Sequence, residues 1–226
     1  MNIVVISLER AKERRDRISA QLGSLGLPFI MMDAVDGKAL SPDDMNKKIH
    51  LPGGYRFGEV FRPGEIGCTM SHIKALQLAK EKGWEYVIIL EDDVVLAEDF
   101  QKRIKLLFKL LPPNWEHVYL SGIPRIPKTH EPLIHMLHIE PSVVIDCIPA
   151  TMIRDISYEK IITYLEKFET TTDDSIIAMI FKYKNLKSYT YYPFCAYVED
   201  DFTYIWDHEL KRDHKSKLYF KNKLNG

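Results

Sequence analysis

Apolar residues along the chain form short unbroken runs that alternate with segments of helical periodicity. The runs at residues 3–6 and 87–90 contain only Val, Ile and Leu, a pattern typical of strands buried on both faces of a sheet. Residues 9–25 and 64–80 have apolar positions three or four residues apart, which predicts two helices with one buried face each. This alternation of strand and helix predicts an α/β fold.

The alternation continues along the chain, interrupted by residues 41–63. That segment is rich in Pro and Gly and has little periodicity, so it is predicted to be an irregular loop, and a lid over a site is one interpretation. Ser7 and Ser157 precede helical segments and are predicted to cap them. The other predicted elements are a strand at 27–32, a helix at 98–111, a strand at 117–120, two short strands within 131–146, a strand at 145–153, helices at 157–168 and 175–181, and a strand-like aromatic run at 187–198.

Three consecutive carboxylates, Glu91, Asp92 and Asp93, follow the apolar run at 87–90. In open α/β sheets ligands bind beyond the carboxyl ends of the strands, so this motif is predicted to lie at a binding site. Adjacent carboxylates repel one another unless a cation neutralises them, and oxygen ligands suit Mg²⁺ or Mn²⁺. Alternation in an extended chain would direct Glu91 and Asp93 to one side and Asp92 to the other. A divalent metal site is one interpretation, and an acidic turn without a ligand is the other.

Further polar residues lie at the ends of the other predicted strands. Ser7 follows the first strand and Asp33 follows the second, so both are predicted at the same sheet edge as the carboxylates. Arg10 and Arg15 belong to a basic segment at the start of the first helix. Their positive charge would favour an anionic ligand at this edge, although a solvated helix face is the simpler interpretation.

Two other motifs could carry chemistry. Ser71 and His72, near a predicted helix start, could hold phosphate or could make structural hydrogen bonds. Asp173 and Asp174 follow a run of threonines, and either they cap the next helix or one of them faces the cleft as a general base. A second Glu-Asp-Asp motif at 199–201 is the weaker metal candidate, because exposed acids are common near a chain end.

Composition narrows the class of protein. The hydrophobic share of 46% and the charged share of 28% are ordinary for a globular protein, and the formal net charge of -1 argues against a general nucleic-acid binder. The 226 residues suit one domain, predicted at 1–207, followed by a basic tail at 208–226.

Cys68, Cys147 and Cys195 form no CxxC pair, so neither a disulfide framework nor a zinc knuckle is indicated. The N-terminal apolar run is too short for a signal peptide or a membrane span, and we expect a cytoplasmic protein.

Three motifs occur in order along the chain: IVVISLERAKERRDR, GEIGCTMSHIKALQLA and WEYVIILEDDV. With them the chain resembles glycosyltransferase family 25, the lipooligosaccharide-biosynthesis glycosyltransferases, and the later TTDD motif extends the resemblance to about residue 180. The resemblance implies a GT-A-like, Rossmann-related α/β fold with a mixed sheet flanked by helices. It also implies a UDP-sugar donor, Mn²⁺ (or Mg²⁺) as cofactor, and transfer with inversion at the anomeric carbon.

The resemblance also implies roles for particular residues. Glu91, Asp92 and Asp93 match the metal and diphosphate motif, with Glu91 and Asp93 as the predicted metal ligands. Asp173 and Asp174 match an acidic pair near the acceptor or donor sugar, and one of them is the predicted catalytic base. The residues predicted to bind the substrates are Ser7, Arg10, Arg15, Asp33, Ser71, His72 and Asp92.

The implied reaction transfers a hexose, with galactose favoured, from a UDP-sugar to a glycan of bacterial lipooligosaccharide. Two alternatives remain open, a non-catalytic UDP-sugar or glycan binder of the same fold and a metal-dependent phosphoesterase. The phosphoesterase would need a second set of metal ligands, and no HxD or HxH pattern supplies one. The tail from His208, with six Lys or Arg against two acids, predicts either peripheral contact with an anionic inner membrane or a solvated terminus.

Overall fold

The structure, a computed structural model, describes residues 1–43, 55–56, 59–60, 62–121, 123–125, 137–138, 144–146, 148–191, 194–198, 202–203 and 208–209. Most of the predicted loop at 41–63, the second Glu-Asp-Asp motif at 199–201, Cys147 and the tail after Glu209 lie outside these residues. The division into a domain at 1–207 and a basic tail therefore stays a prediction. Within the described part of the chain, no helix combines the length and the apolar character needed to cross a membrane.

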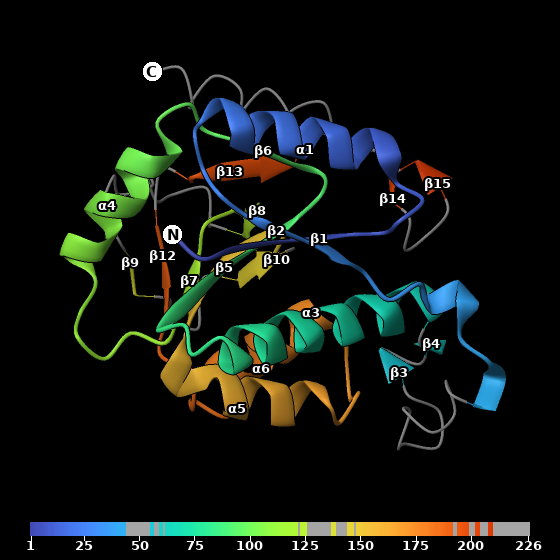
Figure 1. Cartoon of the computed structure of the whole chain (residues 1–226). Helices are drawn as coiled ribbons and strands as arrows, with labels where there is room; N and C mark the ends of the chain where they lie inside the picture. Colours follow the sequence, from blue (N-terminus) through green and yellow to red (C-terminus); the bar gives the residue numbers. More distant parts are fainter. Residues whose placement is uncertain are drawn as a thin grey trace.

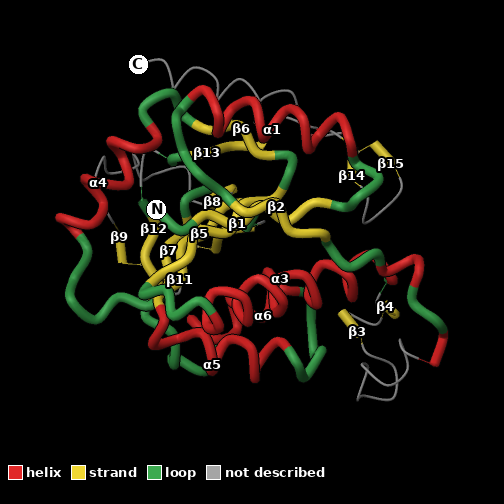
Figure 2. The backbone as a smooth tube through the Cα atoms, in the orientation of Figure 1, coloured by secondary structure: helices red, strands yellow, loops and turns green. Residues whose placement is uncertain are grey.

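A seven-stranded mixed sheet runs through the middle of the protein in the order β2-β1-β5-β11-β7-β12-β9 (Figures 1 and 2). β1 is parallel to β2 and to β5, whereas β11 is antiparallel to both of its neighbours, β5 and β7. β12 is parallel to β7 and antiparallel to β9. The strands are β1 (Ile3–Ser7), β2 (Ile30–Asp33), β5 (Tyr86–Glu91), β7 (His117–Tyr119), β9 (Leu137–His138), β11 (Ala150–Arg154) and β12 (Ser188–Thr190).

Helices cover both faces of this sheet, which confirms the predicted class of a mixed α/β fold. One face carries α3 (Pro63–Glu81), α5 (Asp155–Leu165) and α6 (Thr172–Phe181), which lie together below the sheet in Figure 1. The other face carries α1 (Lys12–Ser24), α4 (Phe100–Leu110) and a two-stranded sheet of β6 (Val94–Leu96) and β13 (Ala196–Val198).

The central strand β5 shows why the apolar runs fold into this sheet. Val87 and Ile89 belong to the core under α3, α5 and α6, whereas Ile88 and Leu90 belong to the core under α1 and α4. None of the four side chains is more than 1% exposed. Burying such a side chain stabilises the fold by about 1.5–3 kcal/mol. The strand is therefore fixed in the middle of the sheet, and its polar end is fixed at the edge.

The remaining described elements are small. They are a 3-10 helix, η1 (Gly37–Ala39), and three two-stranded sheets formed by β3 (Tyr55–Arg56) with β4 (Glu59–Val60), β8 (Ile123–Arg125) with β10 (Val144–Asp146), and β14 (Phe202–Thr203) with β15 (His208–Glu209).

Two predicted helix caps are wrong. α1 begins at Lys12 with Ala11 as its N-cap. Ser7 is instead the last residue of β1, and its hydroxyl donates to the Asp92 carboxylate at the sheet edge. α5 begins at Asp155 with Arg154 as its N-cap. Ser157 lies inside the first turn, where its hydroxyl donates back to the carbonyl of Arg154 at 2.7 Å, an alternative that serine commonly takes within helices.

Candidate active site

The parallel strands β1, β2 and β5 bring their carboxyl ends to one edge of the sheet. Ser7 is in register with Asp33 on β2, and Ile6 is in register with Glu91 on β5. Asp92 and Asp93 follow directly. A cleft at this edge is lined by Ile6, Ser7, Leu8, Arg10, Arg14, Ala34, Val35, Asp36, Gly37, Lys38, Gly64, Cys68, Ser71, Glu91, Asp92 and Asp93. The structure thus brings the three carboxylates into one cleft with residues from β1, α1, the loop after β2, and α3.

Asp92 is nearly buried and is held by two donors. The Ser7 hydroxyl donates to Oδ2 at 2.5 Å, and Arg14 Nη1 donates to Oδ1 at 3.1 Å. Burial raises the pKa of Asp92, while Ser7 and the Arg14 guanidinium act in the opposite direction. Because both carboxylate oxygens accept hydrogen bonds, Asp92 joins α1 and β1 to the turn after β5.

Asp93 also lies near the Arg14 guanidinium. Its Oδ2 is 3.9 Å from Arg14 Nη1, so one guanidinium serves both aspartates. The alternation predicted from Glu91 to Asp93 does not continue, because β5 ends at Glu91 and the next two residues form a turn. The negative charge of Asp93 also acts on Cys68 across the cleft.

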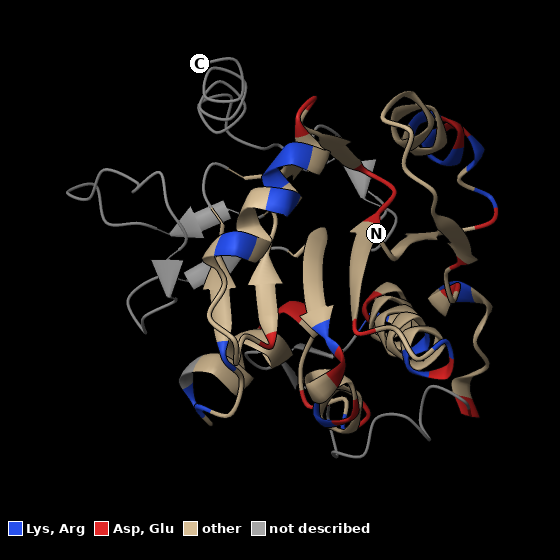
Figure 3. Ribbon diagram, turned by 60° about the vertical axis from the view of Figure 1, so that its left-hand side comes forward, with Lys and Arg blue, Asp and Glu red and all other residues tan. Residues whose placement is uncertain are grey.

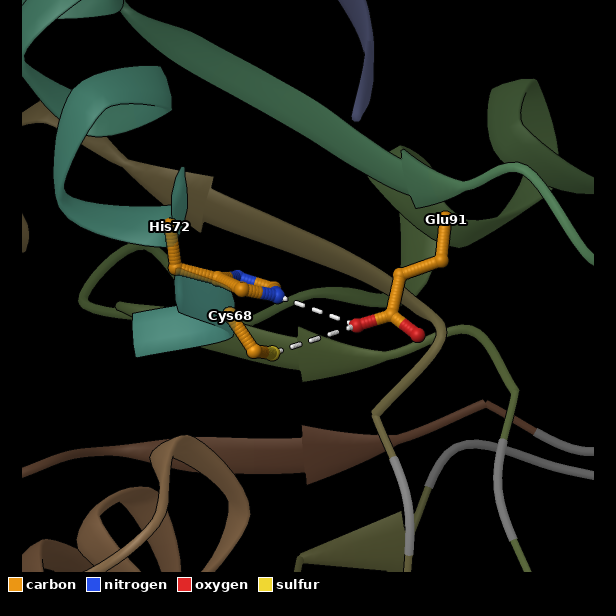
Figure 4. A group of neighbouring side chains, drawn as sticks. All are labelled: Cys68, His72 and Glu91. Atoms are coloured by element: carbon orange, nitrogen blue, oxygen red, sulfur yellow. Dashed lines mark hydrogen bonds and ion pairs between the residues drawn. The ribbon is translucent and has the colours of Figure 1, made fainter. Parts of the chain in front are cut away.

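Glu91 points toward α3. Its Oε1 lies 3.2 Å from His72 Nε2 and 3.9 Å from Cys68 Sγ (Figure 4). Cys68 and His72 are four residues apart on α3 and therefore lie on one helix face. Burial and the neighbouring charge of Glu91 raise the pKa of the Cys68 thiol well above its usual value.

Ser71 and His72 do not form the predicted helix-start phosphate site. α3 begins at Pro63, so His72 lies nine residues after the first residue of the helix and is buried. The Ser71 hydroxyl donates to the carbonyl of Gly67 at 2.7 Å and accepts from the amide of Val35 at 2.8 Å. Ser71 thereby attaches the loop after β2 to α3 and forms part of the cleft wall.

The two predicted basic residues, Arg10 and Arg15, each form an ion pair with a different aspartate. Arg10 forms an ion pair with Asp36, and both residues line the cleft. Arg15 forms an ion pair with Asp33 and donates to the carbonyl of Ser7 at 3.1 Å. Arg15 and Asp33 therefore join the ends of β1 and β2 beside the cleft, whereas Arg10 supplies positive charge within it.

The predicted acidic pair lies at the start of α6, which is Thr172–Phe181 and begins earlier than the sequence suggested. The helix is capped by Thr171, whose hydroxyl accepts from the amide of Asp174. The carboxylate oxygen Oδ2 of Asp174 in turn accepts from Thr171 at 3.2 Å and from Thr170 at 3.3 Å. Asp174 thus acts as part of a helix cap.

Asp173 lies where its charge reaches the cleft wall. Its carboxylate raises the pKa of Cys68 and contributes, after burial, to the raised pKa of Tyr119 at the end of β7. The start of α6 is held against α3 by Thr172, whose hydroxyl oxygen is 3.0 Å from that of Thr69. Of the two predicted base candidates, Asp173 is the one whose charge acts on Cys68 in the cleft wall, whereas the carboxylate of Asp174 accepts hydrogen bonds within the cap of α6.

Arg14, Lys38 and Cys68 are among the cleft residues that sequence reasoning missed. Arg14 was one of several arginines in a basic helix, and only its contacts with Asp92 and Asp93 after β5 distinguish it. Cys68 carried a usable signal, since it precedes His72 by four residues on the helix that comes directly before the acidic strand.

The loop after β2 approaches α3 so closely that no side chain fits at Gly37 in the loop or at Gly67 in the helix. A Cβ at Gly67 would lie 2.5 Å from the Val35 carbonyl oxygen and 2.7 Å from the Gly37 amide nitrogen. We expect Gly67→Ala to lower the free energy of unfolding by about 1–3 kcal/mol, as overpacking does. The matched control is Gly23→Ala in α1, where nothing lies within 4 Å of the added carbon and the variant should gain up to about 1 kcal/mol. Equal melting temperatures for the two variants would contradict this close contact.

The fold and the site define an α/β protein with an acidic ligand cleft at the carboxyl edge of its parallel strands. A model of glycosyltransferase family 25 (LPS biosynthesis protein) matches residues 1–137. The chain belongs to glycosyltransferase family 25.

Several curated relatives share part of this chain. Human procollagen galactosyltransferase 2 is 33% identical over 126 residues, which is 53% of this chain and 20% of that protein. Human inactive glycosyltransferase 25 family member 3 is 31% identical over the same length, covering 53% of this chain and 21% of that protein. A glycosyltransferase 25 family member of Aedes aegypti is 38% identical over 109 residues, which is 46% of this chain and 18% of that protein. The chain thus spans about a fifth of the length of these relatives.

Solved structures with a similar arrangement include two glycosyltransferases. One is involved in the glycosylation of the major capsid of PBCV-1, with a TM-score of 0.48, 11% identity, and coverage of 85% of this chain and 82% of that chain. The other is a mutant of the Drosophila beta-1,4-galactosyltransferase 7 in complex with manganese, UDP-Gal and xylobiose. It has a TM-score of 0.47 and 11% identity, and the match covers 97% of this chain and 79% of that chain.

Proposed function

We propose that this protein transfers a hexose, with galactose favoured, from a UDP-sugar to a glycan acceptor, with inversion and with the help of a divalent metal ion. The observation that carries the proposal is the placement of Glu91, Asp92 and Asp93 in a cleft at the carboxyl ends of three parallel strands. Membership of family 25 supports glycosyl transfer rather than phosphoester hydrolysis. Galactose is supported by the name of the human relative procollagen galactosyltransferase 2.

The donor atoms of the cleft suit Mn²⁺ or Mg²⁺, because carboxylate oxygens are the ligands these hard cations prefer. Glu91 and Asp93 would hold the ion, since both oxygens of Asp92 already accept hydrogen bonds from Ser7 and Arg14. When bound, such an ion stabilises the charge that develops on the leaving diphosphate.

The other residues of the cleft have roles that follow from their charge and position. Arg10 and Lys38 line the cleft and would attract the diphosphate of the donor, while Arg14 offsets the repulsion between Asp92 and Asp93. Asp173 is our choice of general base, because the Asp174 carboxylate is engaged in the cap of α6. The base would take the proton of the acceptor hydroxyl as that oxygen attacks the anomeric carbon.

For the acceptor we propose a glycan of lipooligosaccharide, which the description of the family as LPS biosynthesis proteins supports. The name of the human relative points instead to procollagen as an acceptor class. A lipid-linked acceptor would place a cytoplasmic enzyme at the inner face of the bacterial membrane.

We further propose that the protein binds this membrane peripherally through its basic tail together with α4. Lys102, Lys105 and Lys109 lie on α4, and Leu106 and Phe108 are exposed on the same helix. Figure 3 colours the lysines and arginines of the described residues blue. Each lysine near an anionic leaflet is worth about 1 kcal/mol, or roughly a fivefold change in affinity.

We expect the full chain to co-sediment with vesicles that contain anionic lipid and to lose this binding as salt is raised. Removal of residues 210–226 and the triple change Lys102→Gln, Lys105→Gln and Lys109→Gln should each weaken binding. Unchanged binding by both variants would eliminate the proposed membrane surface.

The function is tested by measuring UDP release from UDP-galactose, UDP-glucose and UDP-N-acetylhexosamines, with Mn²⁺ and with a chelator. Lipooligosaccharide oligosaccharide and a procollagen peptide serve as parallel acceptors. We expect UDP release from UDP-galactose only when both Mn²⁺ and an acceptor are present. Release that is equally fast with chelator would contradict the metal-dependent mechanism.

A second candidate function is a UDP-sugar or glycan binder without turnover, and the names of the inactive family 25 relatives favour it. Such a protein would bind UDP in a Mn²⁺-dependent way by calorimetry and would release no UDP with any donor. The same two measurements therefore separate the two functions.

A further inference from the structure

Three chemically different ligand atoms come together on the α3 side of the cleft. Cys68 Sγ, His72 Nε2 and a carboxylate oxygen of Glu91 all lie within 4.8 Å of one another. Figure 4 shows the cysteine and the histidine pointing from one face of α3 toward the glutamate at the end of β5. The group therefore combines a thiol, an imidazole and a carboxylate from two consecutive elements, α3 and β5.

We propose that Cys68, His72 and Glu91 form a binding site for a borderline-soft divalent ion, with Zn²⁺ as the expected occupant. Thiolate and imidazole ligands favour zinc and related transition metals, whereas Mg²⁺ and Mn²⁺ favour sites made of oxygen atoms alone. The site is thus different in ligand chemistry from the pair Glu91 and Asp93. Its ability to bind the ion does not rest on glycosyl transfer.

The distances between these atoms are close to those a tetrahedral zinc ion requires. Zinc bonds of about 2.0–2.3 Å at tetrahedral angles place a nitrogen and an oxygen ligand roughly 3.4 Å apart, and a sulfur and an oxygen ligand roughly 3.6 Å apart. Here Nε2 and Oε1 are 3.2 Å apart, and Sγ and Oε1 are 3.9 Å apart. The Cys68 sulfur and the His72 nitrogen lie within 4.8 Å of each other, where zinc would place them roughly 3.6 Å apart, so side-chain movements of up to about 1 Å would complete the coordination.

The protein places all three ligands on regular elements, α3 and β5. Cys68 and His72 are held on one face of α3, whose buried residues pack against the sheet, and the His72 ring is itself buried. Glu91 is fixed by the backbone of β5 between β1 and β11. A preformed ligand set of this kind loses little conformational freedom when an ion binds.

The open side of the site faces the cleft. Cys68 and Glu91 line the cleft, whereas His72 lies behind them in the core. Three protein ligands and one exchangeable position are typical of zinc sites that bind water or substrate, while structural zinc sites have four protein ligands. The fourth position would be open to water or to a phosphate oxygen. Because Glu91 belongs to both ligand sets, Zn²⁺ and the proposed Mn²⁺ would compete for it.

Cobalt substitution tests this site without any activity assay. Co²⁺ is added to the full chain in the absence of nucleotide, and the near-ultraviolet thiolate-to-cobalt band and the visible bands of four-coordinate cobalt are recorded. We expect both in the wild type, with stoichiometric displacement by Zn²⁺. Cys68→Ser should lose the thiolate band, and the matched control Cys195→Ser, whose thiol is buried in the core under α1 and α4, should keep it.

Zinc affinity gives a second measurement. Loss of an outer-shell partner typically weakens metal binding by about 10- to 100-fold, so removal of a ligand in Cys68→Ser or Glu91→Gln should weaken Zn²⁺ binding by at least roughly 100-fold. Should a variant fail to fold, alkylation of the wild type followed by peptide mass spectrometry replaces it. Bound Zn²⁺ should then protect Cys68 and leave the rate at Cys195 unchanged.

Absence of a thiolate band in the wild type, or a band that persists in folded Cys68→Ser, would overturn the proposal. So would equal alkylation of Cys68 with and without Zn²⁺. These outcomes leave the proposed transferase unaffected, because UDP release is measured separately. Failure of UDP release with an intact cobalt spectrum would overturn the function and leave the metal site standing.

Discussion

Asp93→Asn is expected to abolish Mn²⁺-dependent binding of UDP while the melting temperature stays near that of the wild type. The carboxylate lies in the cleft directly after β5, and its replacement by an amide removes the charge that would hold the ion. Since loss of an outer-shell partner costs about 10- to 100-fold in metal affinity, loss of a ligand should cost at least roughly 100-fold. Isothermal titration calorimetry with UDP and Mn²⁺ measures the change.

The second Glu-Asp-Asp motif supplies the control for this prediction. Asp201→Asn alters the same residue type in the same local sequence, EDD, and should leave UDP binding unchanged. If Asp201→Asn weakens binding and Asp93→Asn does not, the metal ligands lie in the C-terminal motif. If neither variant weakens binding, neither motif holds the ion.

Asp173→Asn should lower kcat by roughly 10²- to 10⁴-fold, the usual contribution of a general base, with donor binding nearly unchanged. The reason is that its charge acts on Cys68 in the cleft wall and on Tyr119 at the end of β7, and we propose that the acceptor hydroxyl approaches the donor near them. Initial rates at saturating donor and acceptor measure kcat, and calorimetry with UDP and Mn²⁺ measures binding.

Asp174→Asn is the matched control for the base, because it changes the adjacent acid of the same helix turn. Its carboxylate accepts hydrogen bonds from Thr170 and Thr171, so we expect a loss of stability of about 0.5–2 kcal/mol with near-normal kcat. A large loss of kcat in Asp174→Asn together with normal kcat in Asp173→Asn would exchange the two roles. Normal kcat in both variants would place the base outside α6.

The sequence predicted the central sheet and the place of the site well because both depend on local patterns. Apolar runs such as 87–90 are buried on both faces wherever they occur in a layered α/β fold, and a parallel strand delivers its last residues to the ligand edge. Glu91, Ser7 and Asp33 were therefore placed correctly at one edge from the pattern alone.

Side-chain roles at the edge could not be predicted in the same way. Serine is a residue type that commonly caps helices, so Ser7 was predicted to cap the first helix. Its hydroxyl donates to Asp92 instead, and this contact depends on the pairing of β1 with β5. The contact of Glu91 with Cys68 and His72 depends on where α3 crosses the end of β5. Such tertiary placements have no signature in a single sequence beyond the four-residue spacing on α3.

The measurement that tests the central claim most directly is sugar transfer by the wild type and by Asp93→Asn, assayed side by side at equal protein, Mn²⁺, UDP-galactose and acceptor. Mass spectrometry of the acceptor and quantification of UDP follow the two products. We predict that the wild type forms galactosylated acceptor and UDP in equal amounts and that Asp93→Asn forms neither. Equal product formation by the two proteins would contradict the assignment of the sheet-edge carboxylates as the catalytic metal site.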